Sequence, residues 1–158
     1  MKLQSLLLVA VTATTTFAAQ QPILGAFAIG VSNLTASTDF YMNQLGFVST
    51  GQTFDVASYN EIVLKLPGAS SGSALALMQF KDGRNVEKQA AKLMLFVEDV
   101  DVMLKKMEDN GLEILARPGV TLVNGKNTTM PTVMARDPDG YILEFNPLST
   151  FNTSGTGF

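Results

Sequence analysis

The sequence predicts an α+β domain built from two βαβββ modules, and three observations support this prediction. An apolar strand followed by a helix at residues 26–46 recurs in plan at residues 92–111, about 66 residues further along the chain. Three short apolar runs typical of strands follow each of these helices. The spacing is too long for a solenoid repeat, so the two segments are interpreted as halves of one domain at residues 23–147.

The first module is expected at residues 23–80. A strand begins at Ala26, Asn33 is a helix N-cap signal, and Gly46 is a helix stop signal. Apolar runs then predict three further strands, at residues 47–54, 59–66 and 74–80.

The second module is expected at residues 92–147, after a polar linker at residues 81–91. Its first strand begins at Lys92, and Asp99 takes the place of Asn33 as the helix cap. The remaining strands are predicted at residues 112–116, 132–135 and 141–145, followed by a flexible tail at residues 148–158.

The first 18 residues have the features of a secretory signal peptide. Lys2 is the only charge, and the apolar run at residues 6–11 is too short to cross a bilayer about 30 Å thick. Thr16 and Ala18 are small residues that suit signal peptidase, so cleavage is expected near Ala18. The sequence therefore predicts a secreted protein without a transmembrane span.

The amino-acid composition excludes several kinds of catalytic and metal site. Cysteine is absent, which excludes a disulfide framework, a zinc–thiolate site and a cysteine nucleophile. Histidine is absent too, so none can activate a serine. The formal net charge of −3 argues against nucleic acid or an anionic membrane as a partner.

Glycosylation is predicted from three sequons, which begin at Asn33, Asn127 and Asn152. These triplets fit a eukaryotic secretory route, although such triplets also arise by chance in Asn/Thr-rich sequence. Asn33 is the least favoured acceptor of the three, because a glycan there competes with its role as a helix cap.

Glu144 is the first functional candidate. The Asp-Pro-Asp-Gly turn at residues 137–140 leads into the apolar strand that contains Glu144. A carboxylate among Tyr, Ile, Leu and Phe side chains costs free energy unless it meets a cation, a metal or a proton.

Several features together resemble the glyoxalase/bleomycin-resistance/dioxygenase family, the vicinal oxygen chelate superfamily. They are the paired βαβββ modules, the Val-Ser-Asn-Leu…Asp-Phe-Tyr…Leu-Gly-Phe segment of the first, and Asp-Pro-Asp-Gly-Tyr-Ile-Leu-Glu-Phe closing the second. The resemblance covers roughly residues 23–147. It implies curled mixed sheets that enclose a cleft, in which up to four side chains hold a divalent metal.

In this chain, the four positions that the resemblance implies for metal ligands fall on Ala26, Ala76, Lys92 and Glu144. Only Glu144 has ligand atoms for a metal, and the Lys92 ammonium would occupy the place of the ion. No cofactor is therefore expected, and Lys92 and Glu144 are expected to form an ion pair that lowers the pKa of the carboxyl group. This pair could transfer a proton, orient a polar ligand or be purely structural.

Strand alternation gives the other candidate ligand-binding residues, since residues two apart share a face. They are Met94 and Phe96 beside Lys92, Ile142 and Asn146 beside Glu144, Met78 beside Ala76, and Ala26 on the first strand of module one. This lining suits a small hydrophobic molecule, although the same residues could fill an ordinary core. Arg136 could clamp an anionic ligand at the cleft mouth or pair with Asp137 or Asp139.

Two functions follow from these residues and the resemblance. The first is a metal-independent lyase, isomerase or cyclase acting on a hydrophobic substrate, with Glu144 and Lys92 as its catalytic pair. The alternative is a protein that sequesters a small molecule without catalysis, as resistance proteins of the family do. A degenerate structural domain is a third interpretation, and the resemblance also allows a homodimer.

Overall fold

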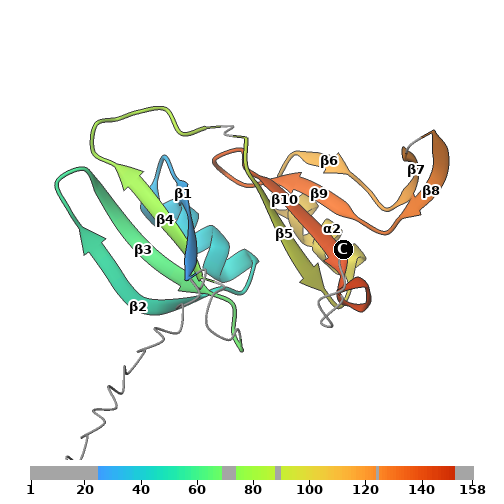
Figure 1. Cartoon of the computed structure of the whole chain (residues 1–158), viewed down its shortest axis with the longest axis horizontal. Helices are drawn as coiled ribbons and strands as arrows, with labels where there is room; N and C mark the ends of the chain where they lie inside the picture. The colour runs from blue at the N-terminus through green and yellow to red at the C-terminus, as the bar shows by residue number, and fades with distance from the viewer. Residues whose placement is uncertain (1–24, 69–73, 88–89, 124, 152–158) are drawn as a thin grey trace, which may run out of the picture.

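The computed structural model describes residues 25–68, 74–87, 90–123 and 125–151 (Figure 1). The predicted signal peptide and the sequon at Asn152 lie outside these ranges. Two four-stranded mixed sheets and a two-stranded sheet form in the described part, which confirms the predicted α+β fold. No helix within the described ranges is long and apolar enough to cross a membrane.

Module one follows the predicted βαβββ order. It consists of β1 (Ala26–Gly30), α1 (Leu34–Asp39) with a π-helical continuation η1 (Phe40–Gln44), β2 (Val48–Asp55), β3 (Tyr59–Lys65) and β4 (Ala74–Phe80). The sheet order is β1-β4-β3-β2, with β1 parallel to β4 and the other pairs antiparallel. Asn33 caps α1 as predicted, because its Oδ1 accepts a hydrogen bond of 3.0 Å from the Ala36 amide.

Module two repeats this arrangement with one addition. Its elements are β5 (Lys92–Val97), α2 (Val100–Asp109), β6 (Ile114–Ala116), β9 (Val133–Arg136) and β10 (Ile142–Pro147), in the sheet order β5-β10-β9-β6. Asp99 caps α2 by accepting from the amides of Asp101 and Val102. A hairpin of β7 (Gly119–Val123) and β8 (Lys126–Met130) is inserted before β9, where the sequence analysis expected only a connection.

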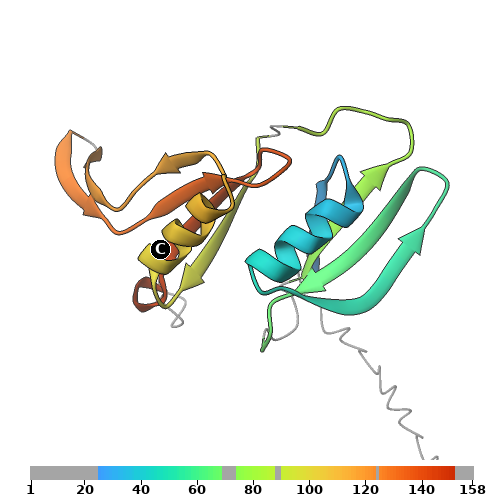
Figure 2. The ribbon, with the colours of Figure 1, turned by 180° about the vertical axis from the view of Figure 1, so that it is seen from behind.

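The two helices cover the same side of the molecule, as Figure 2 shows, and leave the other face of each sheet without a helix. Leu75 and Leu77 of β4, and Leu143 and Phe145 of β10, belong to the buried core. The residues between them in each strand therefore point to the helix-free face. Glu144 lies on this second face.

The Asp-Pro-Asp-Gly turn joins the modules through a buried polar network. Asp139 is 2% exposed and accepts hydrogen bonds from the amide and hydroxyl of Ser32 and from the hydroxyl of Ser37. Asp137 is 4% exposed and accepts from the hydroxyl of Tyr41 at 2.8 Å. Donors of module one thus bind both carboxylates of the turn, which belongs to module two. We call Ser32, Ser37, Tyr41, Asp137 and Asp139 the junction network.

Candidate functional site

Lys92 and Glu144 form the predicted ion pair. Lys92 is the first residue of the edge strand β5, and Glu144 is the third residue of the neighbouring strand β10. Lys92 Nζ contacts Glu144 Oε2 directly, while Asn146 Nδ2 donates to the other carboxylate oxygen at 3.0 Å. Thr132 in turn donates to Asn146 Oδ1 at 2.8 Å, which fixes the orientation of that amide.

The pair is asymmetric in exposure. The Glu144 side chain is 9% exposed, whereas the Lys92 side chain is 43% exposed. Burial alone raises the pKa of Glu144, but the hydrogen bonds from Lys92 and Asn146 and the positive charge of Lys92 outweigh it, so the pKa falls below its usual value. Glu144 is therefore an ionised carboxylate at neutral pH, and the more exposed member of the pair is the Lys92 ammonium.

The strand registers support the predicted equivalence of the two modules. Ala28 pairs with Ala76 in module one, and Met94 pairs with Glu144 in module two. Ala76 and Glu144 thus hold the same position: each is opposite the residue that lies two places after Ala26 or Lys92 in the parallel neighbouring strand.

The donors at these positions do not fit a divalent metal. Two of the four side chains are methyl groups and a third is an ammonium, which leaves the two oxygens of Glu144. Within the described ranges, no group of three or more carboxylate, imidazole or thiol side chains is arranged to hold a metal. Catalytic metal sites in proteins usually need about three protein ligands.

A cavity of about 470 Å³ opens beside the ion pair, between the two modules. We call it the seam cavity. Module one contributes Phe27, Phe47, Leu66, Ala74 and Leu75 to its walls. Module two contributes residues 92–96, Leu148 and Phe151.

The seam cavity contains some of the predicted ligand-binding residues but not all of them. Met94 and Phe96 line it together with Lys92. The other predicted lining residues do not take part in it: Ala26, Ala76, Met78, Ile142 and Asn146. Alternation identifies a face of a sheet, whereas this cavity follows the outer edge of β5 and meets side chains of both faces.

The end of the described chain supplies a wall that the sequence analysis missed. Residues 148–150 form a short 3-10 helix, η2, and the Phe151 ring lies 4.7 Å from the Phe96 ring between centroids. The structure thus has a short helix at residues 148–150, where a flexible tail was expected. The signal was the apolar pair Leu148 and Phe151, three residues apart, which one helical turn brings to the same side.

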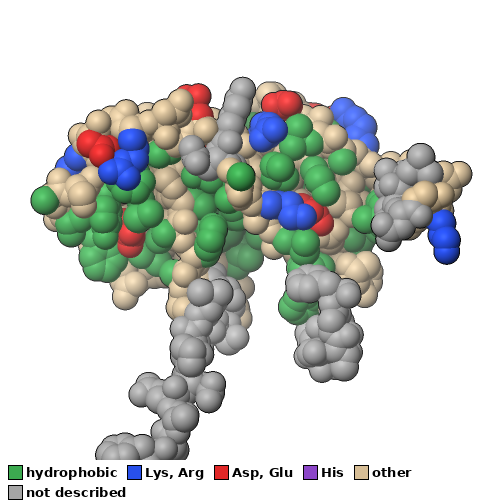
Figure 3. Space-filling view, turned by 45° about the horizontal axis from the view of Figure 1, so that its top comes forward, with side chains coloured by type: hydrophobic (Ala, Val, Ile, Leu, Met, Phe, Trp, Pro, Cys, Tyr) green, Lys and Arg blue, Asp and Glu red, His purple; other side chains and the backbone are tan. Residues whose placement is uncertain are grey.

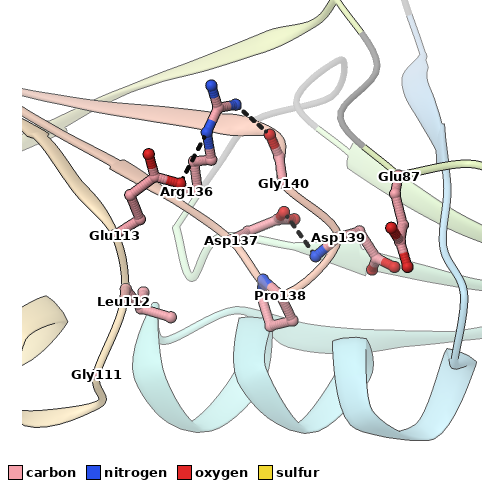
Figure 4. A pocket seen from close by; sticks show the side chains of 9 residues that line it. All are labelled: Glu87, Gly111, Leu112, Glu113, Arg136, Asp137, Pro138, Asp139 and Gly140. Atoms are coloured by element: carbon pink, nitrogen blue, oxygen red, sulfur yellow. Dashed lines mark hydrogen bonds and ion pairs between the residues drawn. The ribbon is translucent and has the colours of Figure 1, made fainter.

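Arg136 is not at the seam cavity, and it pairs with neither Asp137 nor Asp139. Its guanidinium donates to the Gly140 carbonyl at 2.7 Å and contacts Glu113 at 3.2 Å, as Figure 4 shows. It lines a separate cavity of about 340 Å³ behind the turn. The expected surface pair with the two aspartates is wrong, because the junction network takes both carboxylates into the interior.

The two sequons within the described ranges differ in what their asparagines do. The Asn33 side chain caps α1, as described above. Asn127 is exposed on β8 of the inserted hairpin, and Thr129 of the same sequon is exposed as well.

The two paired modules define the class of the protein, a small domain built from two βαβββ units. The family model of the Glyoxalase/Bleomycin resistance protein/Dioxygenase superfamily matches residues 23–145. The chain therefore belongs to this superfamily. A comparison with curated protein sequences gave no match.

Solved structures with the same fold include proteins of different activities. The trypanothione-dependent glyoxalase I of Leishmania major is 21% identical, with a TM-score of 0.67 over 82% of this chain and 89% of that one. TnmS3, an antibiotic binding protein from Streptomyces sp. CB03234, is 20% identical, with a TM-score of 0.59 over 83% and 98%. The Bacillus subtilis YycE protein, described as a putative glyoxalase/fosfomycin resistance protein, is 20% identical, with a TM-score of 0.60 over 88% and 98%. At these identities the likeness shows the fold alone.

Proposed function

We propose that this protein binds a small apolar molecule in the seam cavity, with the Lys92–Glu144 pair as its polar anchor. The observation that carries the proposal is the lining of the cavity, in which eleven of the twelve described residues are apolar. A volume of about 470 Å³ lies within the range of about 300–1,000 Å³ that is usual for ligand pockets. The antibiotic-binding protein among the structural neighbours is consistent with such a role.

Binding is favoured over proton transfer by the state of Glu144. Its lowered pKa makes the carboxylate a weak base, and both of its oxygens already accept hydrogen bonds. The ion pair replaces the metal that the family fold would otherwise hold, so the proposed binding needs no cofactor.

A second candidate is a metal-independent lyase, isomerase or cyclase. The specific observation for it is that an ammonium and a carboxylate touch at the rim of an apolar cavity, where they could act as acid and base. Glu144→Gln separates the two functions, because it should abolish turnover of any compound that the protein converts, while Lys92, the member of the pair that lines the cavity, still anchors the bound molecule.

The setting of this function is also part of the proposal. The signal-peptide features of residues 1–18 support a secreted protein, and the exposed Asn127 supports glycosylation there. Hydrophobic side chains spread across both modules on the face seen in Figure 3. Such apolar surface supports a homodimer that covers it.

A binding experiment with a neutral apolar dye, Nile red, tests the proposal. Phe27→Ser removes an aromatic wall of the cavity from a side chain that is 51% exposed, so the fold should tolerate it. The matched control is Phe54→Ser, which removes an equally exposed ring, 47% exposed, outside the cavity. Loss of the ring should weaken dye binding about tenfold, from roughly 1.4 kcal/mol of lost apolar contact.

The outcome is unambiguous in either direction. Weaker binding by the Phe27 variant alone supports the seam cavity as the binding site. Equal binding by the wild-type protein and both variants contradicts it.

A further inference from the structure

We infer that the ligand of the seam cavity is amphipathic and carries one anionic group, as a medium-chain monocarboxylate does. Its carboxylate binds the Lys92 ammonium and its apolar chain lies along β5. This inference rests on the proposed function and adds the chemical class of the ligand.

The lining shows where the charge of the ligand belongs. Lys92 is the one charged residue among the twelve described residues that line the cavity, and no carboxylate shares the lining with it. An ammonium at the rim of an apolar cavity attracts an anionic group, because the low dielectric of the walls strengthens the interaction.

The geometry of the ion pair leaves the ammonium available to a ligand. A lysine has three N–H donors, and Glu144 Oε2 takes one of them. Glu144 is nearly covered, and its second oxygen accepts from Asn146, whereas Lys92 is 43% exposed. A ligand that enters the cavity therefore meets the positive half of the pair.

The number of donors limits the charge of the anion. Phosphate and dianionic groups are usually held by several cations or by a bidentate arginine. Among its described residues, the lining offers a single lysine and no arginine. One carboxylate matches one ammonium.

The segment of β5 that lines the cavity sets the length of the apolar part of the ligand. Lys92 is at one end of the lining stretch of β5 and Phe96 is at the other. Four residue steps along a strand span about 13 Å, since each step rises about 3.3 Å. Phe96 and the adjoining Phe151 ring then form an aromatic wall at the end of the chain farthest from the carboxylate.

The test compares dodecanoic acid with its neutral methyl ester, each measured by displacement of Nile red from the full chain. The wild-type protein is expected to bind the acid at least tenfold more tightly than the ester. The variant that removes the ammonium is Lys92→Met combined with Glu144→Gln, so that no buried carboxylate is left unpaired. In this variant the two affinities should become equal within about twofold.

The control variant is Lys105→Met combined with Asp109→Asn, which removes another ion pair, on α2 and absent from the lining. It should keep the wild-type preference for the acid. A loss of preference in this control would overturn the inference, because the removal of any ion pair would then explain the effect.

Failure of the inference and failure of the proposed function give different results. Tight binding of both probes with equal affinity overturns the anionic ligand and leaves an apolar binding site. Absence of binding by both probes and by Nile red overturns the proposed function as well.

Discussion

The junction network predicts a measurable cost for Tyr41→Phe. The Tyr41 side chain is fully buried, and its hydroxyl donates to Asp137 Oδ2 at 2.8 Å. The substitution removes this donor and keeps the ring, which packs edge-on against Phe40 and Phe47 at centroid distances of 5.4 and 5.6 Å. The effect therefore isolates one hydrogen bond to a buried carboxylate.

The magnitude follows from the charge of the acceptor. A hydrogen bond to a charged group contributes about 1.5–3 kcal/mol, more than a neutral one. Asp137 keeps two backbone donors, the amides of Asp139 and Tyr141, so the loss should lie near the middle of this range, about 2 kcal/mol. For a chain of 158 residues, this lowers the Tm by about 4–8 °C.

The pH dependence gives a second readout. Burial raises the pKa of Asp137, and the Tyr41 hydroxyl acts against that rise. Without the hydroxyl the pKa rises further, so the ionised carboxylate becomes more costly in the folded state. The destabilisation by Tyr41→Phe should accordingly be larger at pH 7 than at pH 3, where Asp137 is mostly protonated in both variants.

Urea denaturation at the two pH values measures both effects. The control is Tyr59→Phe, which keeps a ring that packs on Phe80 away from the junction network. A Tyr41 variant within about 0.5 kcal/mol of the wild-type protein at pH 7 would refute the reasoning. Equal losses at pH 7 and pH 3 would refute the part that depends on the charge of Asp137.

Three further predictions concern stability. The pKa of Glu144 in the folded protein is lower than its ordinary value of 4.5, which stabilises the fold at pH values above 4.5. This stabilisation is lost as the pH falls through the pKa of the folded state, so Glu144→Gln should flatten the acid limb of a Tm–pH profile. An unchanged acid limb would contradict this prediction. Gly30→Ala places a Cβ 2.9 Å from Val86 Cγ1 and should cost about 1–3 kcal/mol in urea, whereas Gly25→Ala, with open space around it, should cost nothing measurable. Asp99→Ala removes the acceptor for two amides at the start of α2 and should cost about 1 kcal/mol; a cost below about 0.3 kcal/mol would mean that the cap is dispensable.

The local signals in the sequence predicted the modules because each depends on neighbouring residues. Asn33 and Asp99 cap the two helices as expected. The ion pair was predictable from the family resemblance, which placed Lys92 and Glu144 at two of the four metal-ligand positions. The inserted hairpin carried a recognisable signal, the Asn-Gly pair at residues 124–125, which is typical of a tight hairpin turn.

The parts that failed depend on how the two modules meet. The sequence of the turn is typical of an exposed loop and gives no sign that Asp137 and Asp139 are buried. They are buried because side chains of module one donate hydrogen bonds to both carboxylates. The seam cavity likewise joins Phe27 to Phe151, which are far apart in the chain. No local pattern encodes these contacts, because they arise from the packing of one module on the other.

The most direct test of the central claim is native mass spectrometry of the protein titrated with dodecanoate, before and after chelator treatment. We expect one dodecanoate to bind per chain. The chelator should leave this binding unchanged, and Phe27→Ser should weaken it. A mass increment of one divalent ion that disappears with the chelator would contradict the account, and so would dodecanoate binding that the Phe27 substitution leaves unchanged.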